Sequence, residues 1–200
     1  NKEVPRERIF REAEITSLID SSYVVRCDNK IGHWNHDRYF IVLQYIQGES
    51  LRNIIDSGTK PDLGTFKTVA LGLMEAIRAF HYYKDAEGNP SPLLHSDIKP
   101  DNVIITRDKR GILIDCGISG EPRIDTFKGT PGYVPPDCLS GTDMSFSEGG
   151  DLFALGVTLW EWVFGEKPYK NPAVGDRPDI PKNAHAFEYV LPWLSRAVAT

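Results

Sequence analysis

The stretch that most constrains the fold is Leu93–Gly117, LLHSDIKPDNVIITRDKRGILIDCG. It contains two short apolar runs, NVIIT and GILID, joined by the polar residues RDKR, a pattern that predicts a small β-ribbon. Asp97 and Asn102 precede the first strand and Asp115 ends the second, so we expect their side chains to meet at one end of the ribbon. Such oxygens suit Mg²⁺ shared with phosphates, which makes Asn102 and Asp115 a candidate metal pair with Lys99 beside them.

Each of these side chains alone also fits an ordinary structural role. Asp97 can form a turn, Asn102 can cap a helix and Asp115 can end a strand without any part in chemistry. Only the combination of the residues within one short stretch indicates a functional site.

The rest of the chain alternates between helix and strand patterns, which predicts an α+β fold. Residues 28–37, DNKIGHWNHD, have the polar composition of a hairpin turn, and the pattern becomes mainly helical after Gly48. The last predicted helix has an apolar face made of Phe66, Val69, Leu73, Ala76, Ile77 and Phe80. The predicted elements outside the ribbon are a helix over 6–19, strands over 23–27 and 38–46, and helices over 50–55 and 65–83.

Composition indicates a globular protein and excludes several classes. The chain has 200 residues, of which 40% are hydrophobic and 26% charged, enough for one substantial core or two small lobes. Its formal charge of -5 and its lack of any Lys/Arg run argue against binding to a nucleic acid backbone. No apolar run reaches the roughly 18 residues that a membrane span needs. The first residues, NKEVPRER, do not resemble a signal peptide.

The cysteines favour a reducing compartment. Cys27, Cys116 and Cys138 are widely spaced and form no CxxC pair, so buried, reduced thiols are expected rather than disulfides or a zinc site. We therefore expect the protein in the cytoplasm.

Four motifs, in order along the chain, resemble the signatures of eukaryotic-type Ser/Thr protein kinases: HSDIKPDN, DCG, GTPGYVPPD and DLFALGV. They resemble bacterial members more than animal ones. The resemblance implies a bilobal fold of the protein-kinase type, with residues 1–47 as a partial N-lobe (one helix, a hairpin and the hinge). Residues 48–200 would be a mostly helical C-lobe with the catalytic loop, the metal-binding turn and the activation segment.

The resemblance also assigns roles in the transfer of the γ-phosphate of ATP to protein Ser/Thr hydroxyls. Asp97 would be the catalytic base, and Asn102 and Asp115 would hold Mg²⁺, with Mn²⁺ as an alternative ion. Lys99 would steady the γ-phosphate, and Thr130 would hydrogen-bond to both Asp97 and Lys99. The last two residues favour Ser/Thr over Tyr substrates.

For the nucleotide, the resemblance places Glu12 as the partner of the lysine that anchors ATP, with Glu14 as the runner-up. A solvated glutamate on a charged helix face explains Glu12 equally well. The apolar residues predicted at the nucleotide would also suit ordinary strand packing. The residues predicted to line the ATP site are Leu43 as gatekeeper, Gln44 and Ile46 in the hinge, Ser50 at the ribose and Ile104 beneath adenine.

Four further residues are implied as structural support: His95, Asp137, Asp151 and Gly156. Asp151 would brace the backbone of the catalytic loop. The motifs depart from the family at Ser96, where an Arg usually receives a phosphate of the activation segment, and at Cys116, where a larger Phe is usual. With Ser96 there, we expect basal activity not to require phosphorylation of the candidate phosphosite, Thr126.

The family's glycine-rich phosphate loop and V-A-I-K lysine have no counterpart in these residues, and LPWLSRAVAT ends before the family's last helices. We therefore expect a fragment that is inactive and poorly soluble or oligomeric when expressed alone. Two alternatives are a pseudokinase or interaction module and a small-molecule kinase of the aminoglycoside type. Lys99, Thr130 and the GYVPPD stretch argue against the second, because they serve a groove for protein substrates.

Overall fold

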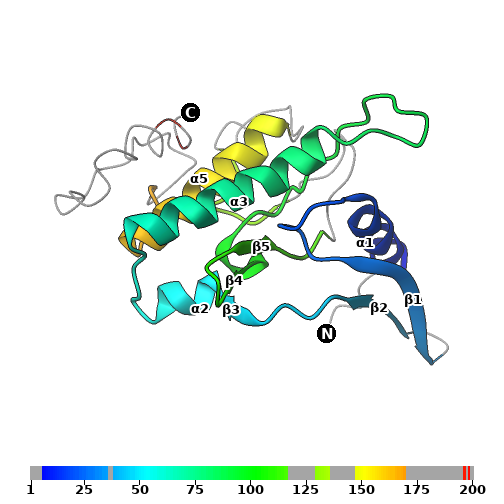
Figure 1. Ribbon diagram of the computed structural model, residues 1–200, viewed down its shortest axis with the longest axis horizontal. Helices are drawn as coiled ribbons and strands as arrows, with labels where there is room; N and C mark the ends of the chain where they lie inside the picture. Colours follow the sequence, from blue (N-terminus) through cyan, green and yellow to red (C-terminus); the bar gives the residue numbers. More distant parts are fainter. Residues whose placement is uncertain are drawn as a thin grey trace.

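The computed structural model describes residues 6–35, 38–116, 129–135, 147–169, 196 and 198. Helices α3 (Leu63–His81) and α5 (Glu148–Phe164) lie side by side, while α1 (Arg6–Leu18) packs on a β-hairpin at the other end of the molecule (Figure 1). A three-stranded sheet lies between these two parts (Figure 1). The arrangement confirms the predicted α+β class, with small antiparallel sheets.

The hairpin consists of β1 (Cys27–Asn35) and β2 (Arg38–Leu43), paired antiparallel with Ile31 opposite Ile41. The predicted turn over 28–37 is therefore wrong, because most of it is strand. Backbone pairing with the apolar strand β2 extends β1 through residues whose own composition indicated a turn. The pairing is irregular between Cys27 and Ile31, where the register shifts.

The predicted strand over 23–27 is also wrong, because β1 begins only at Cys27. Val24 and Val25 are buried, and their segment pairs with β5 rather than with β2. The Val25 amide donates to the Leu113 carbonyl at 2.9 Å, and the Leu113 amide donates to the Tyr23 carbonyl at 2.8 Å. These two bonds fix the loop after α1 to the central sheet.

The central sheet has the order β3 (Gly48–Ser50), β4 (Val103–Thr106) and β5 (Gly111–Leu113), all antiparallel. The predicted ribbon of β4 and β5 is confirmed, but β3 was not predicted. A Cβ atom on Gly48 would lie 2.4 Å from the Ile105 carbonyl oxygen, so glycine permits the close approach of β3 to β4.

Side chains cap the helices that follow. The Ser50 hydroxyl accepts from the Asn53 amide at the start of α2 (Leu51–Asp56), and the Asp62 carboxylate accepts from the Thr65 amide at the start of α3. Both helices were predicted within two residues of their bounds. The apolar face predicted for the second of them is buried throughout: Phe66, Val69, Leu73, Ala76, Ile77 and Phe80.

Helix α5 is buried on nearly all sides, which explains its apolar sequence. Its N-cap is Ser147, and it ends at Gly165 with φ at +82°, a left-handed conformation that favours glycine. The largest fully buried side chains include Phe80 of α3, Leu113 of β5 and Trp160 of α5.

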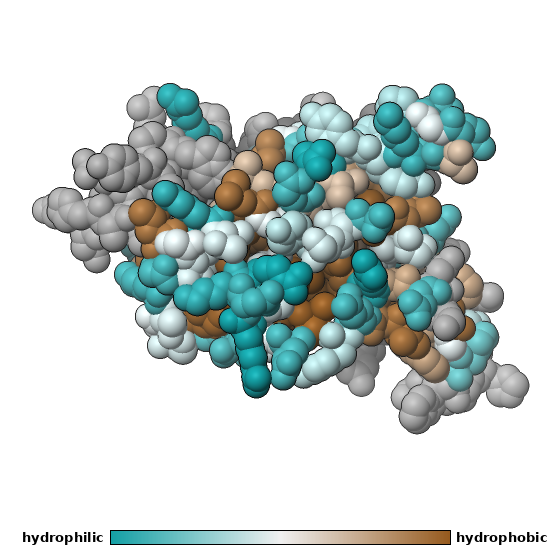
Figure 2. All heavy atoms as spheres, viewed as in Figure 1, coloured by the Kyte–Doolittle hydropathy of each residue, from teal (hydrophilic) through white to brown (hydrophobic). Residues whose placement is uncertain are grey.

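Hydrophilic side chains cover most of the face in view, with hydrophobic atoms visible between them (Figure 2). Within the described part of the chain, no helix is both long and apolar enough to cross a membrane.

Candidate active site

The structure brings three of the predicted residues, Asp97, Lys99 and Thr130, into a closed triangle. The Lys99 ammonium donates to Asp97 Oδ2 at 2.7 Å and to Thr130 Oγ1 at 2.9 Å. The Thr130 hydroxyl in turn donates to Asp97 Oδ1 at 2.6 Å. The side chains of Asp97 and Lys99 are only 11% and 20% exposed, so this charged group is largely shielded from water.

Asn102 orients Asp97 from the other side. It ends the short 3-10 helix η1 (Pro100–Asn102), and its Nδ2 donates to the Asp97 carbonyl at 2.9 Å and to Asp97 Oδ2 at 3.2 Å. The Ile114 amide donates to the Asn102 carbonyl at 2.9 Å, which ties the end of the ribbon to this loop. Because the Asn102 amide nitrogen faces Asp97, its side-chain oxygen is the atom suited to a metal ion.

Asp115 lies just after β5, half-buried, with φ at +60° in the left-handed region. Aspartate is among the few residues that adopt this conformation at low cost, and it turns the chain sharply at the end of the strand. Cys116, which follows, is buried in the core. The bond from the Ile114 amide to the Asn102 carbonyl places the residue before Asp115 next to the loop that holds Asn102.

Asp151, in the first turn of α5, holds the backbone of the loop that precedes Asp97. Its two carboxylate oxygens accept from the His95 amide at 3.0 Å and the Ser96 amide at 2.9 Å, and His81 Nε2 lies 2.9 Å from Oδ2. Asp151 is 2% exposed. Ser96 has φ at +67°, so these bonds hold a serine in a conformation that favours glycine.

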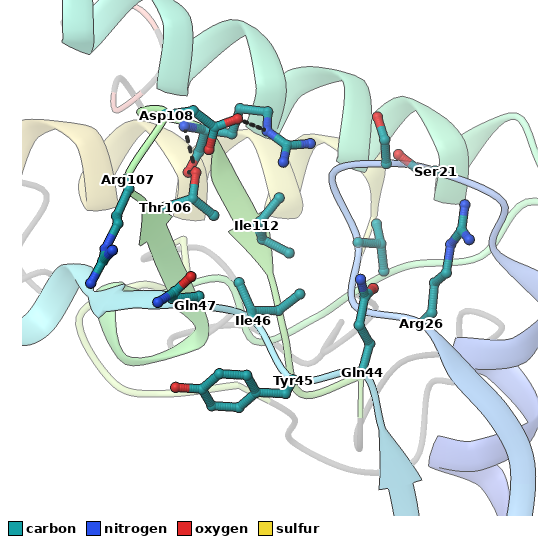
Figure 3. A pocket seen from close by; sticks show the side chains of 13 residues that line it. Ser21, Arg26, Gln44, Tyr45, Ile46, Gln47, Thr106, Arg107, Asp108 and Ile112 are labelled. Atoms are coloured by element: carbon teal, nitrogen blue, oxygen red, sulfur yellow. Dashed lines mark hydrogen bonds and ion pairs between the residues drawn. The ribbon is translucent and has the colours of Figure 1, made fainter.

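Two of the residues predicted at the nucleotide, Gln44 and Ile46, lie on the segment that joins the two sheets. Ser50 pairs with Ile104 across β3 and β4, which places these two predicted neighbours side by side. Gln44 and Ile46 line a hollow of about 510 Å³ that does not include Asp97 (Figure 3). Leu43 is half-buried at the end of β2.

The structure gives the burial of three further predicted residues and does not describe two others. Glu12 is half-buried on α1 whereas Glu14 is exposed, and Gly156 is buried within α5. Asp137 and Thr126 lie outside the described residues.

Residues 1–187 match the family described as the protein kinase domain. The chain belongs to this family.

The kinase domain is similar to Ser/Thr kinases from several organisms. It is 29% identical over 209 aligned residues to the serine/threonine-protein kinase pkn2 of Myxococcus xanthus, covering 97% of this chain and 23% of that protein. It is 30% identical over 178 residues to serine/threonine-protein kinase A of Synechocystis sp., covering 82% of this chain and 33% of that protein. It is 28% identical over 175 residues to human serine/threonine-protein kinase PAK 4, covering 85% of this chain and 27% of that protein.

These relatives include the bacterial Ser/Thr kinases that the motifs resembled, alongside a human one. The chain spans between 23% and 33% of the length of these three proteins.

The kinase domain also contains a partly buried ionic cluster that sequence reasoning missed. Arg52 of α2 lies 3.0 Å from Glu161 Oε1, and its Nη2 donates to the Tyr133 hydroxyl at 2.8 Å. The Tyr133 hydroxyl in turn donates to Glu161 Oε2. Arg52 also lies 3.5 Å from Asp101 in η1 and 3.4 Å from Asp56. The cluster therefore joins α2 and α5 to both segments that carry the triangle of Asp97, Lys99 and Thr130.

The electrostatics of the cluster follow from burial and from one carboxylate. Burial raises the pKa of Tyr133 well above its usual range, and the hydrogen bond and charge of Glu161 raise it further. Burial alone would lower the pKa of Arg52, but the hydrogen bond to Glu161 and the charges around it outweigh this and raise it. A lone glutamate in the apolar helix LFALGVTLWEWVF was the sequence signal that a buried partner exists.

We expect Tyr133→Phe to lower the free energy of unfolding by about 1–2 kcal/mol, because the buried Glu161 loses a hydrogen-bond donor. Urea unfolding measures the change. Tyr169→Phe is the matched control, since Tyr169 is buried but has no side-chain hydrogen bond to the described residues. Equal losses in the two variants would contradict a role for the Tyr133 hydroxyl.

His95 makes stability depend on pH. Burial lowers its pKa below the usual value, although the charges of Asp151, Asp97 and Asp115 act in the opposite direction. As the pH falls through about 6.5, the unfolded chain therefore takes up the proton before the folded one does, and stability is lost.

We expect the free energy of unfolding to fall between pH 7.5 and 5.5, and to fall less steeply in His95→Asn. Asparagine offers an oxygen to the Asp97 amide, which now donates to His95 Nδ1 at 3.3 Å. Urea unfolding at several pH values measures the slope, with the exposed His33→Asn as control. Equal slopes in wild type and His95→Asn would contradict this assignment.

Proposed function

We propose that the chain is the catalytic domain of a protein Ser/Thr kinase, which transfers the γ-phosphate of ATP to Ser or Thr hydroxyls of a protein. The observation that carries the proposal is the closed triangle of Asp97, Lys99 and Thr130 in a chain of the protein kinase domain family. A carboxylate, a cation and a hydroxyl within hydrogen-bond distance of one another can act in phosphate transfer as a base, a positive charge and a group that fixes both.

The roles follow from the transition state, which is loose and places most of its charge on the phosphoryl oxygens. Asp97 accepts the proton of the substrate hydroxyl at Oδ1, which keeps a lone pair beyond its bond from Thr130, whereas Oδ2 already accepts from Lys99 and Asn102. Lys99 lies beside that carboxylate, where its positive charge stabilises the negative charge on the γ-phosphate during transfer. Thr130 fixes both side chains and so reduces the reorganisation needed before transfer.

Asn102 and Asp115 are the residues proposed to hold Mg²⁺. Both offer oxygen ligands, and the ribbon carries both to the same loop. The described residues contain no group of three or more His, Cys, Asp or Glu that could hold a metal. A site with few protein ligands suits Mg²⁺, which usually takes one or two carboxylates together with phosphates and water. When bound, the ion would neutralise charge on the phosphates.

The nucleotide would lie along the connection between the two sheets. Leu43, Ile46 and Ile104 would supply apolar surface, and Gln44 and Ile46 backbone groups. The Ser50 hydroxyl already accepts from the Asn53 amide, but it can still donate to a ribose oxygen. Glu12 would pair with an ATP-anchoring lysine, which fits its half-buried position on α1.

The direct test incubates the polypeptide, as its gene encodes it, with γ-labelled ATP and Mg²⁺, in one reaction with a mixture of protein substrates and in another with aminoglycosides. We expect label on Ser and Thr, little on Tyr, and none when EDTA removes the metal. Nucleotide binding without transfer would instead favour a pseudokinase. Label on aminoglycosides but not on proteins would favour a small-molecule kinase.

A further inference from the structure

A hollow of about 510 Å³ lies where three segments meet (Figure 3). These segments are the loop after α1 (residues 21–26), the connection between the two sheets (residues 44–47) and the turn between β4 and β5 (residues 106–110). The volume is within the range of sites that bind small molecules or short peptide segments. None of the residues in the catalytic triangle lines it.

The rim of the hollow is positively charged, although the chain as a whole has a net charge of -5. Three arginines line it, Arg26, Arg107 and Arg110, against a single carboxylate, Asp108. Asp108 is already paired with Arg110, whose Nε lies 2.7 Å from Oδ2. Within the described part of the chain, Arg26 and Arg107 have no side-chain hydrogen bond or ion pair. Two guanidinium groups are therefore available to a ligand.

The floor of the hollow is apolar. Val24 and Ile112 are each 3% exposed, and Ile46 beside them is half-buried. The side chain of Tyr45, 86% exposed, lies at the edge (Figure 3). A ligand that fits this surface places an apolar group on the floor and negative charges at the rim.

The positions of the free arginines discriminate between ligands. Arg26 and Arg107 lie on opposite sides of the hollow (Figure 3). A single small anion would contact only one of them, whereas an extended peptide can present two separate carboxylates. A nucleic acid is a poor fit, because two free cations give little phosphate neutralisation and only one exposed aromatic side chain is available for stacking.

We propose that this hollow is a docking site for an acidic peptide segment of a partner protein, with an apolar side chain on Val24 and Ile112 and carboxylates at Arg26 and Arg107. Such a segment would contact both sheets at the place where the Gln44 amide donates to the Arg26 carbonyl at 2.9 Å. The proposal does not depend on phosphate transfer. Because Gln44 and Ile46 line the hollow and are also proposed at the nucleotide, peptide binding is measured without ATP, so a failure of either proposal is visible without the other.

The test selects a phage library of random decapeptides on the immobilised polypeptide, followed by anisotropy measurements with the recovered peptides. We expect peptides rich in Asp and Glu. Arg26→Glu combined with Arg107→Glu should weaken their binding at least tenfold, and so should replacing their acids by amides. Raising the salt concentration should also weaken binding.

The matched control combines Lys67→Glu with Lys84→Glu, two exposed lysines outside the hollow that give the same change in net charge. We expect it to change affinity less than twofold. Thermal unfolding checks that each variant is folded. If the double Arg→Glu variant is unfolded, Arg26→Gln combined with Arg107→Gln is used in its place. The proposal is overturned if no peptide is recovered, if the peptides have no excess of acids, or if both arginine variants bind them as tightly as wild type.

Discussion

Asp97→Asn is expected to lower the rate of phosphate transfer by about 10²–10⁴-fold while leaving ATP affinity nearly unchanged. The amide cannot accept the proton of the substrate hydroxyl. It also cannot accept from both neighbours, because Thr130 donates to one Asp97 oxygen and Lys99 to the other. The triangle therefore loses at least one of its bonds together with its base.

Two measurements on the polypeptide separate these effects: initial rates of protein phosphorylation and calorimetric titration with Mg²⁺·ATP. The control is Asp20→Asn, which removes an exposed carboxylate far from the triangle in sequence. If nucleotide affinity fell as much as turnover did, Asp97 would have a structural role and not a catalytic one.

The part of the site that could be predicted from the sequence is the part built from neighbouring residues. Asp97, Asn102 and Asp115 flank the short ribbon of β4 and β5, whose antiparallel pairing returns the chain to the loop that holds Asn102. Thr130 joins them from a separate segment, and only the resemblance of GTPGY to a known motif assigned it to Asp97. The motif resemblance therefore predicted the contact between Thr130 and Asp97, which hydrophobic patterns along the chain could not predict.

Two of the errors in the fold, the strand over 23–27 and the missing β3, have one physical cause. Val24 and Val25 are β-branched and buried, which predicted a strand, but their partner is Leu113, far away in the sequence. Strand propensity reports how well a side chain suits a half-buried surface and does not identify the neighbouring strand. The same limit hid β3, whose pairing with β4 depends on a close approach at Gly48.

The ionic cluster was hidden for a related reason. Arg52 and Glu161 are 109 residues apart, and neither belongs to a motif quoted from the sequence. A charge within an apolar helix indicates that some partner exists, because an unpaired buried charge is costly. It does not indicate which partner, and here the folded arrangement of α2 and α5 decides it.

Asp151→Asn is expected to lower the free energy of unfolding by roughly 3 kcal/mol, a large effect for an isosteric change. The buried carboxylate accepts hydrogen bonds from the amides of His95 and Ser96 through different oxygens. His81 lies beside the oxygen that accepts from His95. An amide has only one oxygen, so at least one buried backbone amide is left without an acceptor. Urea unfolding measures the loss, and Asp20→Asn should change stability by under about 0.5 kcal/mol.

A double-mutant cycle tests whether Asp151 also holds the strained backbone of Ser96. At φ of +67° glycine costs less than serine, so we expect Ser96→Gly to be neutral or stabilising by up to about 1 kcal/mol in wild type. If Asp151 imposes that conformation, Ser96→Gly should recover part of the loss in Asp151→Asn, because glycine adopts the loop geometry with fewer restraints. Activity should recover in parallel, since residue 96 precedes Asp97. Strict additivity of the two changes would show that the Asp151 bonds stabilise the fold without shaping the loop.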